Sequence, residues 1–187
     1  MRVIAGMAKG HRLKAPKGSN TRPTADRIRE SLFSILGTQI VDKPFLDLCA
    51  GSGANGIEAL SRGASYCVFI DKDRRATQVI KENLAATKLE QQGEVYTADI
   101  LRAITILGKK GQRFAFILLD PPYGTKLGPL ALRALVQWKL CTPDGLIIYE
   151  HGQDEAPGEQ GLELIRRKDY GGTSLSFFTQ REGERSL

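Results

Sequence analysis

One short stretch of this chain, residues 45–56, restricts the possible folds more than any other part of the sequence. An apolar run typical of a β-strand ends near Asp47, and Gly51, Gly53 and Gly56 follow at a spacing that leads into a helix. The glycines allow a tight turn and a close approach of a ligand to the backbone, and the helix start offers unpaired N–H groups. This order is typical of nucleotide binding, although a lone Gly-x-Gly-x-x-Gly fits an ordinary strand-to-helix turn equally well.

Strand-like and helix-like segments then alternate along most of the chain. A helix that ends at Gly37 precedes the first strand. We predict further strands at residues 66–70, 94–97, 114–119 and 146–149, with helices at residues 74–86, 100–107 and 127–138 between them. Strands separated by helices require right-handed crossovers and form a mainly parallel sheet that is covered on both faces.

The last part of the chain changes this pattern. Residues 161–168 and 173–180 are two strand-like runs separated by Tyr170-Gly171-Gly172, which predicts an antiparallel hairpin that closes the sheet edge. The sequence therefore predicts an α/β fold with a mainly parallel, seven-stranded sheet. We expect one α/β domain at residues 21–182, a small basic β-hairpin arm at residues 1–20 and a frayed tail at residues 183–187.

Composition limits the functional class. The chain has 187 residues, about one domain, with a formal net charge of +6 and a pI of about 9.3. Because its aromatic and apolar content is ordinary, the positive charge lies on a folded protein and favours an anionic partner. Cys49, Cys67 and Cys141 lie far apart in apolar contexts, which predicts buried reduced thiols in a cytoplasmic protein, without disulfides or a metal site. The most apolar segment, residues 114–119, is too short to cross a bilayer, and no secretory signal is expected.

The first thirty residues carry most of the excess positive charge. Two interpretations remain open, a solvated basic edge and a surface that binds the phosphates of a nucleic acid. The residues that we expect to contact phosphates are Arg2, Lys9, Arg12, Lys14 and Arg22.

Four aspartates follow the predicted strands. In an open α/β sheet, ligands bind beyond the carboxyl ends of the strands, where Asp47, Asp71, Asp99 and Asp120 are expected to lie in one layer. Asp71 lies 20 positions after Gly51, the spacing at which an acid reaches the hydroxyl groups of a ribose. Asp99 is a candidate acceptor for an adenine amino group, with residue 100 packed on the ring. Each acid alone is also compatible with a helix cap or a turn.

The segment Asp120-Pro121-Pro122-Tyr123 points to the chemistry. The two prolines hold the backbone extended and contribute no N–H donors, so carbonyl and carboxylate acceptors dominate this loop. If Asp120 and a proline carbonyl accept both hydrogens of a planar amine, the nitrogen lone pair is free to attack an electrophile. Tyr123 is expected to stack on the base that carries the amine.

These features together resemble a known enzyme class. The chain resembles class I S-adenosylmethionine-dependent methyltransferases that act on exocyclic amines in Asp47-Leu-Cys-Ala-Gly-Ser-Gly, Asp71, Asp99 and Asp120-Pro-Pro-Tyr. More narrowly, it resembles the RsmD family in Arg2-Val-Ile-Ala-Gly, in Thr21-Arg22-Pro23-Thr24 with Arg29-Glu30-Ser31-Leu32-Phe33, and in Ala59-Leu60-Ser61-Arg62-Gly63-Ala64. One departure is Cys49, which stands where phenylalanine is common in the family.

The resemblance implies a Rossmann-like fold, S-adenosylmethionine as cofactor, and the N2 amine of a guanine in small-subunit (16S) ribosomal RNA as target. The RNA is expected within the assembling or assembled subunit, and the protein is expected to be a monomer. The implied cofactor-binding residues are Asp47, Cys49, Ala50, Gly51, Gly53, Asp71, Lys72, Asp99 and Ile100. The implied catalytic residues are Asp120, Pro121, Pro122 and Tyr123.

Four other classes compete with this interpretation. A DNA adenine-N6 methyltransferase shares the Asp-Pro-Pro-Tyr segment but usually carries a sizeable target-recognition region. A glutamine methyltransferase more often has asparagine at position 120. A nicotinamide dehydrogenase accounts for the glycines but not for residues 120–123. A non-catalytic RNA-binding module with a vestigial pocket predicts no cofactor binding.

Overall fold

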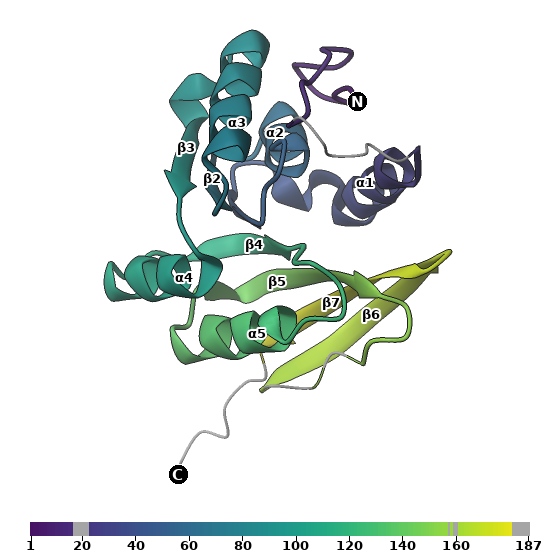
Figure 1. Cartoon of the computed structure of the whole chain (residues 1–187), viewed down its shortest axis with the longest axis vertical. Helices are drawn as coiled ribbons and strands as arrows, with labels where there is room; N and C mark the ends of the chain where they lie inside the picture. The colour runs from purple at the N-terminus through teal and green to yellow at the C-terminus, as the bar shows by residue number, and fades with distance from the viewer. Residues whose placement is uncertain (17–22, 157, 159–160, 181–187) are drawn as a thin grey trace.

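The computed structural model describes residues 1–16, 23–156, 158 and 161–180, and it shows a seven-stranded sheet with helices on both faces (Figure 1). The strand order is β3-β2-β1-β4-β5-β7-β6. Strands β1 to β5 pair in parallel, and β7 is antiparallel to both of its neighbours. The strands are β1 (Pro44–Leu48), β2 (Tyr66–Asp71), β3 (Gly93–Thr97), β4 (Phe114–Leu119), β5 (Cys141–Gly152), β6 (Leu162–Tyr170) and β7 (Thr173–Gln180). The predicted fold class is confirmed.

The structure corrects the length of β5. The strand extends from Cys141 to Gly152, whereas the sequence predicted residues 146–149, because a Pro-Asp-Gly segment within it is typical of a turn. A register shift accommodates this segment: Phe114 of β4 pairs with Cys141, but Phe116 pairs with Leu146. The extra residues therefore bulge out of the ladder without ending the strand.

The carboxyl-terminal hairpin is antiparallel, as predicted, and its turn lies at Gly171 and Gly172. Both glycines have positive φ, 54° and 99°, a conformation that side chains disfavour. The second strand of the hairpin, β7, lies between β5 and β6, so β6 forms the sheet edge. Residues 181–187, which include the predicted tail, lie outside the described residues.

The helices form two layers (Figure 1). On one face of the sheet lie α1 (Pro23–Leu36), α2 (Ala54–Ser61) and α3 (Arg74–Thr87). On the other face lie α4 (Ile100–Lys109) and α5 (Leu127–Gln137). Short 3₁₀ helices at Gly37–Ile40 and Glu90–Gln92 complete the connections.

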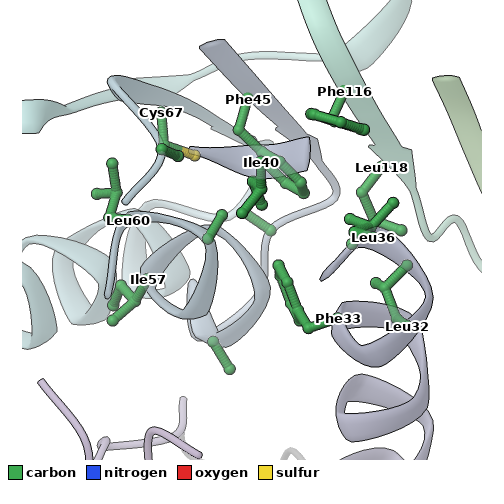
Figure 2. Close-up of a cluster of buried hydrophobic side chains, with 14 of the residues drawn as sticks. Leu32, Phe33, Leu36, Ile40, Phe45, Ile57, Leu60, Cys67, Phe116 and Leu118 are labelled. Carbon is green, nitrogen blue, oxygen red and sulfur yellow. The ribbon is translucent and has the colours of Figure 1, made fainter. Parts of the chain in front are cut away.

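The packing between α1, α2 and the sheet positions the first of these layers. Figure 2 shows Phe33 of α1 beside Phe45 of β1, and their rings stack with centroids 6.2 Å apart. Leu60 of α2 and Leu118 of β4 belong to the same buried cluster. Burying side chains of this size contributes about 1.5–3 kcal/mol each. This cluster fixes α1 against the sheet, and with it Arg29, one turn before Phe33 on the same helix.

Residues 1–16 form a hairpin-like arm with a single antiparallel bridge, between Arg2 and Arg12. The Val3 N–H donates to the His11 carbonyl at 3.0 Å, and the side chains of Val3, Ala8 and Leu13 are buried. The arm therefore has a core-facing side of its own.

Two polar side chains of the domain hold the arm. The carboxylate of Glu58 in α2 is fully buried and accepts hydrogen bonds from the backbone N–H groups of Ile4 and Ala5 at 2.7 and 3.0 Å. The side chain of Asn83 in α3 bonds both the N–H and the carbonyl of Lys14, at 2.8 and 3.0 Å. Side chains of α2 and α3 thus form hydrogen bonds with backbone groups of the arm, and these bonds hold the arm against the domain.

All three cysteines are free in the structure. Cys67 and Cys141 are buried, but Cys49 is half-buried and has a positive φ of 63°. Among the described residues, no helix has the length and hydropathy needed to cross a membrane.

Candidate active site at the carboxyl ends of the strands

A cavity of about 450 Å³ lies at the carboxyl ends of the parallel strands, where the sequence predicted it. The loops after β1, β2, β3 and β4 all contribute to it. It is lined by Cys49, Asp71, Lys72, Asp99, Ile100, Asp120, Pro121, Pro122, Tyr123 and Leu127. Seven predicted residues besides Asp71 and Asp120 therefore line the same cavity, although more than seventy positions of the chain separate Cys49 from Tyr123.

The glycine loop begins at Cys49 and ends at the start of α2. Gly51 and Gly53 have positive φ values of 56° and 76°, and a Cβ added to Gly51 would meet no heavy atom within 4 Å. The backbone at Gly51 is therefore open to a ligand. Gly56 has a different role, because a Cβ there would lie 2.2 Å from the Phe69 ring, so this glycine permits close packing of α2 on β2.

Asp71 ties the glycine loop to the end of β2. Its Oδ2 atom accepts a hydrogen bond from the Gly51 N–H at 2.8 Å, and its Oδ1 atom accepts one from the Asp73 N–H at 2.9 Å. These bonds orient the carboxylate at the cavity wall. The four lone-pair positions of a carboxylate leave further acceptor capacity for a ligand.

Asp99 caps α4. Its Oδ1 atom accepts hydrogen bonds from the N–H groups of Leu101 and Arg102, at 2.9 and 3.2 Å. The sequence left a helix cap open as an alternative role for Asp99, and the structure shows this cap. Asp99 also lies on the cavity wall beside Ile100.

Asp47 does not reach the cavity. Its side chain is 1% exposed and accepts a hydrogen bond from the Gly56 N–H at 2.9 Å, so it supports the glycine loop from behind. Burial is the main reason that the pKa of Asp47 rises from an ordinary 3.8 to about 7, against the lowering effect of the Gly56 N–H. The structure thus separates Asp47 from the other three acids of the predicted layer.

The Asp120–Tyr123 segment forms a further part of the wall of the larger cavity. Burial, and then the charge of Glu150, raises the pKa of Asp120 well above its ordinary value. The ring of Tyr123 is 43% exposed, and its hydroxyl donates to Glu150 Oε1 at 2.9 Å. An exposed ring at the rim of a cavity is available for stacking.

A second cavity, of about 220 Å³, adjoins the first, since Cys49 and Asp120 line both. Ala50, Gly51 and two residues that the sequence analysis missed, Arg29 and Glu150, also line it. Cys49 therefore stands at the junction, where burial and then the charge of Asp120 raise its thiol pKa to about 12.

The two missed residues carry opposite charges. Glu150 follows Tyr149, the predicted end of the fifth strand, so the rule that identified the other acids would have found it. Arg29 is 4% exposed, and its Nη2 donates to the Arg2 carbonyl at 2.8 Å and to Asp26 at 3.0 Å. Among the described residues, its Nε has no hydrogen-bond partner. In the sequence, Arg29 stood out only as part of the family motif Arg29-Glu30-Ser31-Leu32-Phe33, which gave it no role at the site.

His151, which follows Glu150, is not part of either cavity wall. Its ring is buried, and Nε2 lies 2.8 Å from Ser176 Oγ. Burial lowers the pKa of His151. The described residues contain no cluster of three or more histidine, cysteine or acidic side chains that could hold a metal ion.

The arm borders the second cavity and carries exposed basic side chains. Arg2, Lys9, Arg12 and Lys14 are exposed, and Met1 at the start of the arm lines the second cavity. Lys14 is paired with Glu82 at 2.7 Å. Arg22 lies outside the described residues.

Comparisons with a protein-family model, with protein sequences and with solved structures agree with one another. Residues 1–179 match the model of a family described as "Conserved hypothetical protein 95". The chain is 40% identical over 183 residues to "Putative rRNA methyltransferase YlbH" of Bacillus subtilis (strain 168), which covers 97% of this chain and 100% of that protein. It is 40% identical over 123 residues to "Ribosomal RNA small subunit methyltransferase D" of Escherichia coli (strain K12), which covers 66% of this chain and 60% of that protein.

The solved structure described as "Putative methyltransferase yhhF from Escherichia coli" is similar over 96% of this chain and 97% of that chain, with a TM-score of 0.83 and 32% identity.

Proposed function

Because the chain belongs to the RsmD family of class I S-adenosylmethionine-dependent methyltransferases, we propose that it methylates the exocyclic N2 amine of a guanine in small-subunit ribosomal RNA. The observation that carries the proposal is the junction of the two cavities. Asp120 lies at this junction, with the glycine loop on one side and the ring of Tyr123 on the other. A planar base and the cofactor can therefore meet at Asp120.

The residues present fit S-adenosylmethionine. The two cavities, of about 450 and 220 Å³, have the combined size expected for a ligand of this kind. Asp71 and Asp99 offer carboxylate acceptors for ribose hydroxyls and for the adenine amine, with Ile100 as an apolar surface for the ring. On the other side, the open backbone at Gly51 and the buried charge of Arg29 suit the methionyl carboxylate.

When bound, the cofactor supplies an electrophilic methyl group. Asp120 and the carbonyl of Pro121 accept the two hydrogens of the target amine, which orients the nitrogen lone pair, while Tyr123 stacks on the base. Transfer forms a nitrogen–carbon bond, breaks the sulfur–carbon bond and leaves a positive charge on the nitrogen. The cationic amine releases a proton readily, so the site needs no strong general base.

The exposed basic residues of the arm suit the RNA backbone. Arg2, Lys9 and Arg12 lie on the arm that borders the second cavity, so phosphates bound there would be close to the target base. We further propose that the substrate is RNA in an assembling or assembled small subunit, and that the protein acts as a monomer in the cytoplasm.

The test is mass mapping of methylated nucleosides in ribosomal RNA from cells with and without the gene. We expect the loss of one N2-methylguanosine from small-subunit RNA. Purified protein should restore it, and parallel assays on naked RNA and on isolated subunits identify the true substrate. Formation of N6-methyladenosine would favour an adenine methyltransferase, and failure to bind the cofactor in calorimetry would favour a non-catalytic RNA-binding module.

A further inference from the structure

Asp120 directly follows β4, and Glu150 lies near the end of the neighbouring parallel strand β5. The last pair in the ladder between β4 and β5 is Leu119 with Tyr149, and Asp120 and Glu150 are the residues that directly follow this pair along the two chains. Side chains of paired residues in a ladder point to the same face of the sheet. Both residues line the cavity of about 220 Å³ and Asp120 also lines the larger cavity, so a base held at the junction of the two cavities is within reach of both residues.

The carboxyl group of Glu150 is held beside the ring of Tyr123. The Tyr123 hydroxyl donates to Glu150 Oε1 at 2.9 Å and lies 3.1 Å from Thr173 Oγ1. Within the part of the chain that the structure describes, Glu150 Oε2 and both side-chain oxygens of Asp120 have no hydrogen-bond donor. A ligand at this position therefore meets a group of acceptors and must bring donors of its own.

The nucleobases differ in the donors that they place side by side. Guanine carries an N1–H next to its N2 amine, so two neighbouring carboxylates can each accept a hydrogen bond from this edge. Adenine carries a lone pair on N1 next to its N6 amine. A second carboxylate beside the amine would face this lone pair, and the repulsion would disfavour binding.

We propose that Glu150 selects guanine by accepting a hydrogen bond from N1–H, while Asp120 accepts from the neighbouring N2 amine. The inference rests on the proposed function and adds the residue that sets its base specificity. Glu150 also links this choice to stacking, because its other oxygen accepts the Tyr123 hydroxyl.

The electrostatics of the pair agree with this role. Burial raises the pKa of Glu150, and burial followed by the charge of Glu150 raises the pKa of Asp120. Two carboxylates in one cavity repel each other unless donors lie between them. The N1–H and N2–H groups of guanine supply these donors, and the edge of adenine supplies only one of the two.

The test uses a base analogue in which N1 is a hydrogen-bond acceptor and not a donor. Small-subunit RNA is assembled by splint ligation with either guanine or 2-aminopurine at the mapped position and is then reconstituted into subunits. 2-Aminopurine keeps the N2 amine, but its N1 is an acceptor and it lacks O6. The loss of O6 is the same for every protein variant, so the change in the ratio between the unchanged protein and Glu150→Gln reports on N1. For the unchanged protein, we expect kcat/KM for 2-aminopurine to be about 100-fold lower than for guanine, because a buried acceptor then faces a lone pair.

The variant Glu150→Gln should relax this discrimination. Its amide can donate to N1 of 2-aminopurine or accept from N1–H of guanine, so we expect the two values of kcat/KM to lie within about 10-fold. The ratio is measured on a single protein preparation, so partial unfolding affects both substrates equally and cancels.

Glu155→Gln is the matched control. Glu155 accepts hydrogen bonds from the Gly124 N–H at 2.7 Å and from the Tyr149 hydroxyl at 3.3 Å, and it lines neither cavity. The ratio for this variant should equal that of the unchanged protein.

The outcomes separate this inference from the proposed function. If the unchanged protein forms no N2-methylguanosine, the proposed function fails. If it forms N2-methylguanosine but Glu150→Gln keeps the original ratio, only the role of Glu150 is overturned. Weaker binding of S-adenosylmethionine in calorimetry together with an unchanged ratio would instead place Glu150 at the methionyl ammonium group.

Discussion

Asp71 and Asp120 have identical side chains, but their surroundings differ. We expect different roles for them for this reason. Asp71 accepts two backbone hydrogen bonds, from Gly51 and Asp73, which hold it at the glycine loop. Asp120 has a raised pKa and lies beside Glu150. We therefore expect the first to act on cofactor binding and the second on methyl transfer.

Replacing Asp71 should weaken cofactor binding. Asp71→Ala removes a charged acceptor for the ribose hydroxyls, a loss of about 1.5–3 kcal/mol, and thus raises the Kd for S-adenosylmethionine by about 10- to 100-fold. Titration calorimetry measures the change, and Asp144→Ala, at an exposed position of β5, is the control. An unchanged Kd would remove Asp71 from the cofactor site.

Replacing Asp120 should slow methyl transfer without weakening cofactor binding. In Asp120→Ala, the target amine loses the acceptor that orients it, and we expect kcat to fall by about 100-fold. Asp120→Asn keeps one acceptor oxygen and should retain more activity. Single-turnover rates and the Kd for S-adenosylmethionine are measured on each variant. An effect on Kd alone would reverse the assignment of Asp71 and Asp120.

At the scale of elements, α2 and α3 hold the basic arm in place. Glu58 accepts from the backbone of Ile4 and Ala5, and Asn83 bonds the backbone of Lys14 and also donates to the Ser52 carbonyl in the glycine loop. Asn83 thus links the arm to the glycine loop. The side chains of Arg2, Lys9 and Arg12 are exposed on the arm.

Neutralising the arm should reduce the salt dependence of RNA binding. If Arg2, Lys9, Arg12 and Lys14 each contact a phosphate, their joint replacement flattens the slope of log K against log salt by about 3–4 units. Binding is measured across a salt series, while cofactor affinity stays unchanged. Parallel lines for the two proteins would exclude the arm from the RNA interface.

Lys14 provides an internal comparison within this experiment. It is paired with Glu82 at 2.7 Å, so its replacement alone should change the slope less than replacement of Lys9. The KM for RNA should rise in the quadruple variant more than kcat falls, because phosphate contacts are made in both ground and transition states.

At the scale of the whole molecule, one buried acid couples folding to pH. Asp47 is buried at the centre of the sheet, and its pKa is raised from 3.8 to about 7, chiefly by burial. Between these values the native state binds a proton that the unfolded chain has released. The neutral carboxyl group therefore contributes stability that is fully present below pH 3.8 and is lost as the pH rises through about 7.

Asp47→Asn should remove this pH dependence, because the amide oxygen still accepts from the Gly56 N–H but carries no proton to lose. Relative to the variant, the unchanged protein should lose about 1.4 kcal/mol of unfolding free energy per unit of pKa shift as the pH rises. Urea denaturation from pH 4 to 8 measures this difference. The lowered pKa of His151 makes the free energy of unfolding rise with pH, which is the opposite effect. Because His151 is present in both proteins, its contribution cancels in the difference between them. Parallel stability curves would show that Asp47 stays ionised in the folded protein.

The sequence by itself determined the class of fold and most of the residues at the cavity. Hydrophobic runs separated by helices identify a parallel sheet, and the acids after its strands must lie at one edge. The bounds of β4 and β7 follow from local apolar runs alone. Asp71, Asp99, Asp120 and Tyr123 reach the cavity for this reason.

Only the tertiary structure decided which acids face the ligand and which residues join them. Asp47 is turned toward Gly56 and buried, since a strand alternates its side chains between two faces and local sequence does not tell which face holds the ligand. β5 continues through a turn-like segment because β4 provides its hydrogen bonds in a shifted register, and this pairing places Glu150 beside Asp120. Arg29 reaches the second cavity because Phe33 packs α1 against β1, a contact between side chains twelve positions apart that periodicity alone does not specify.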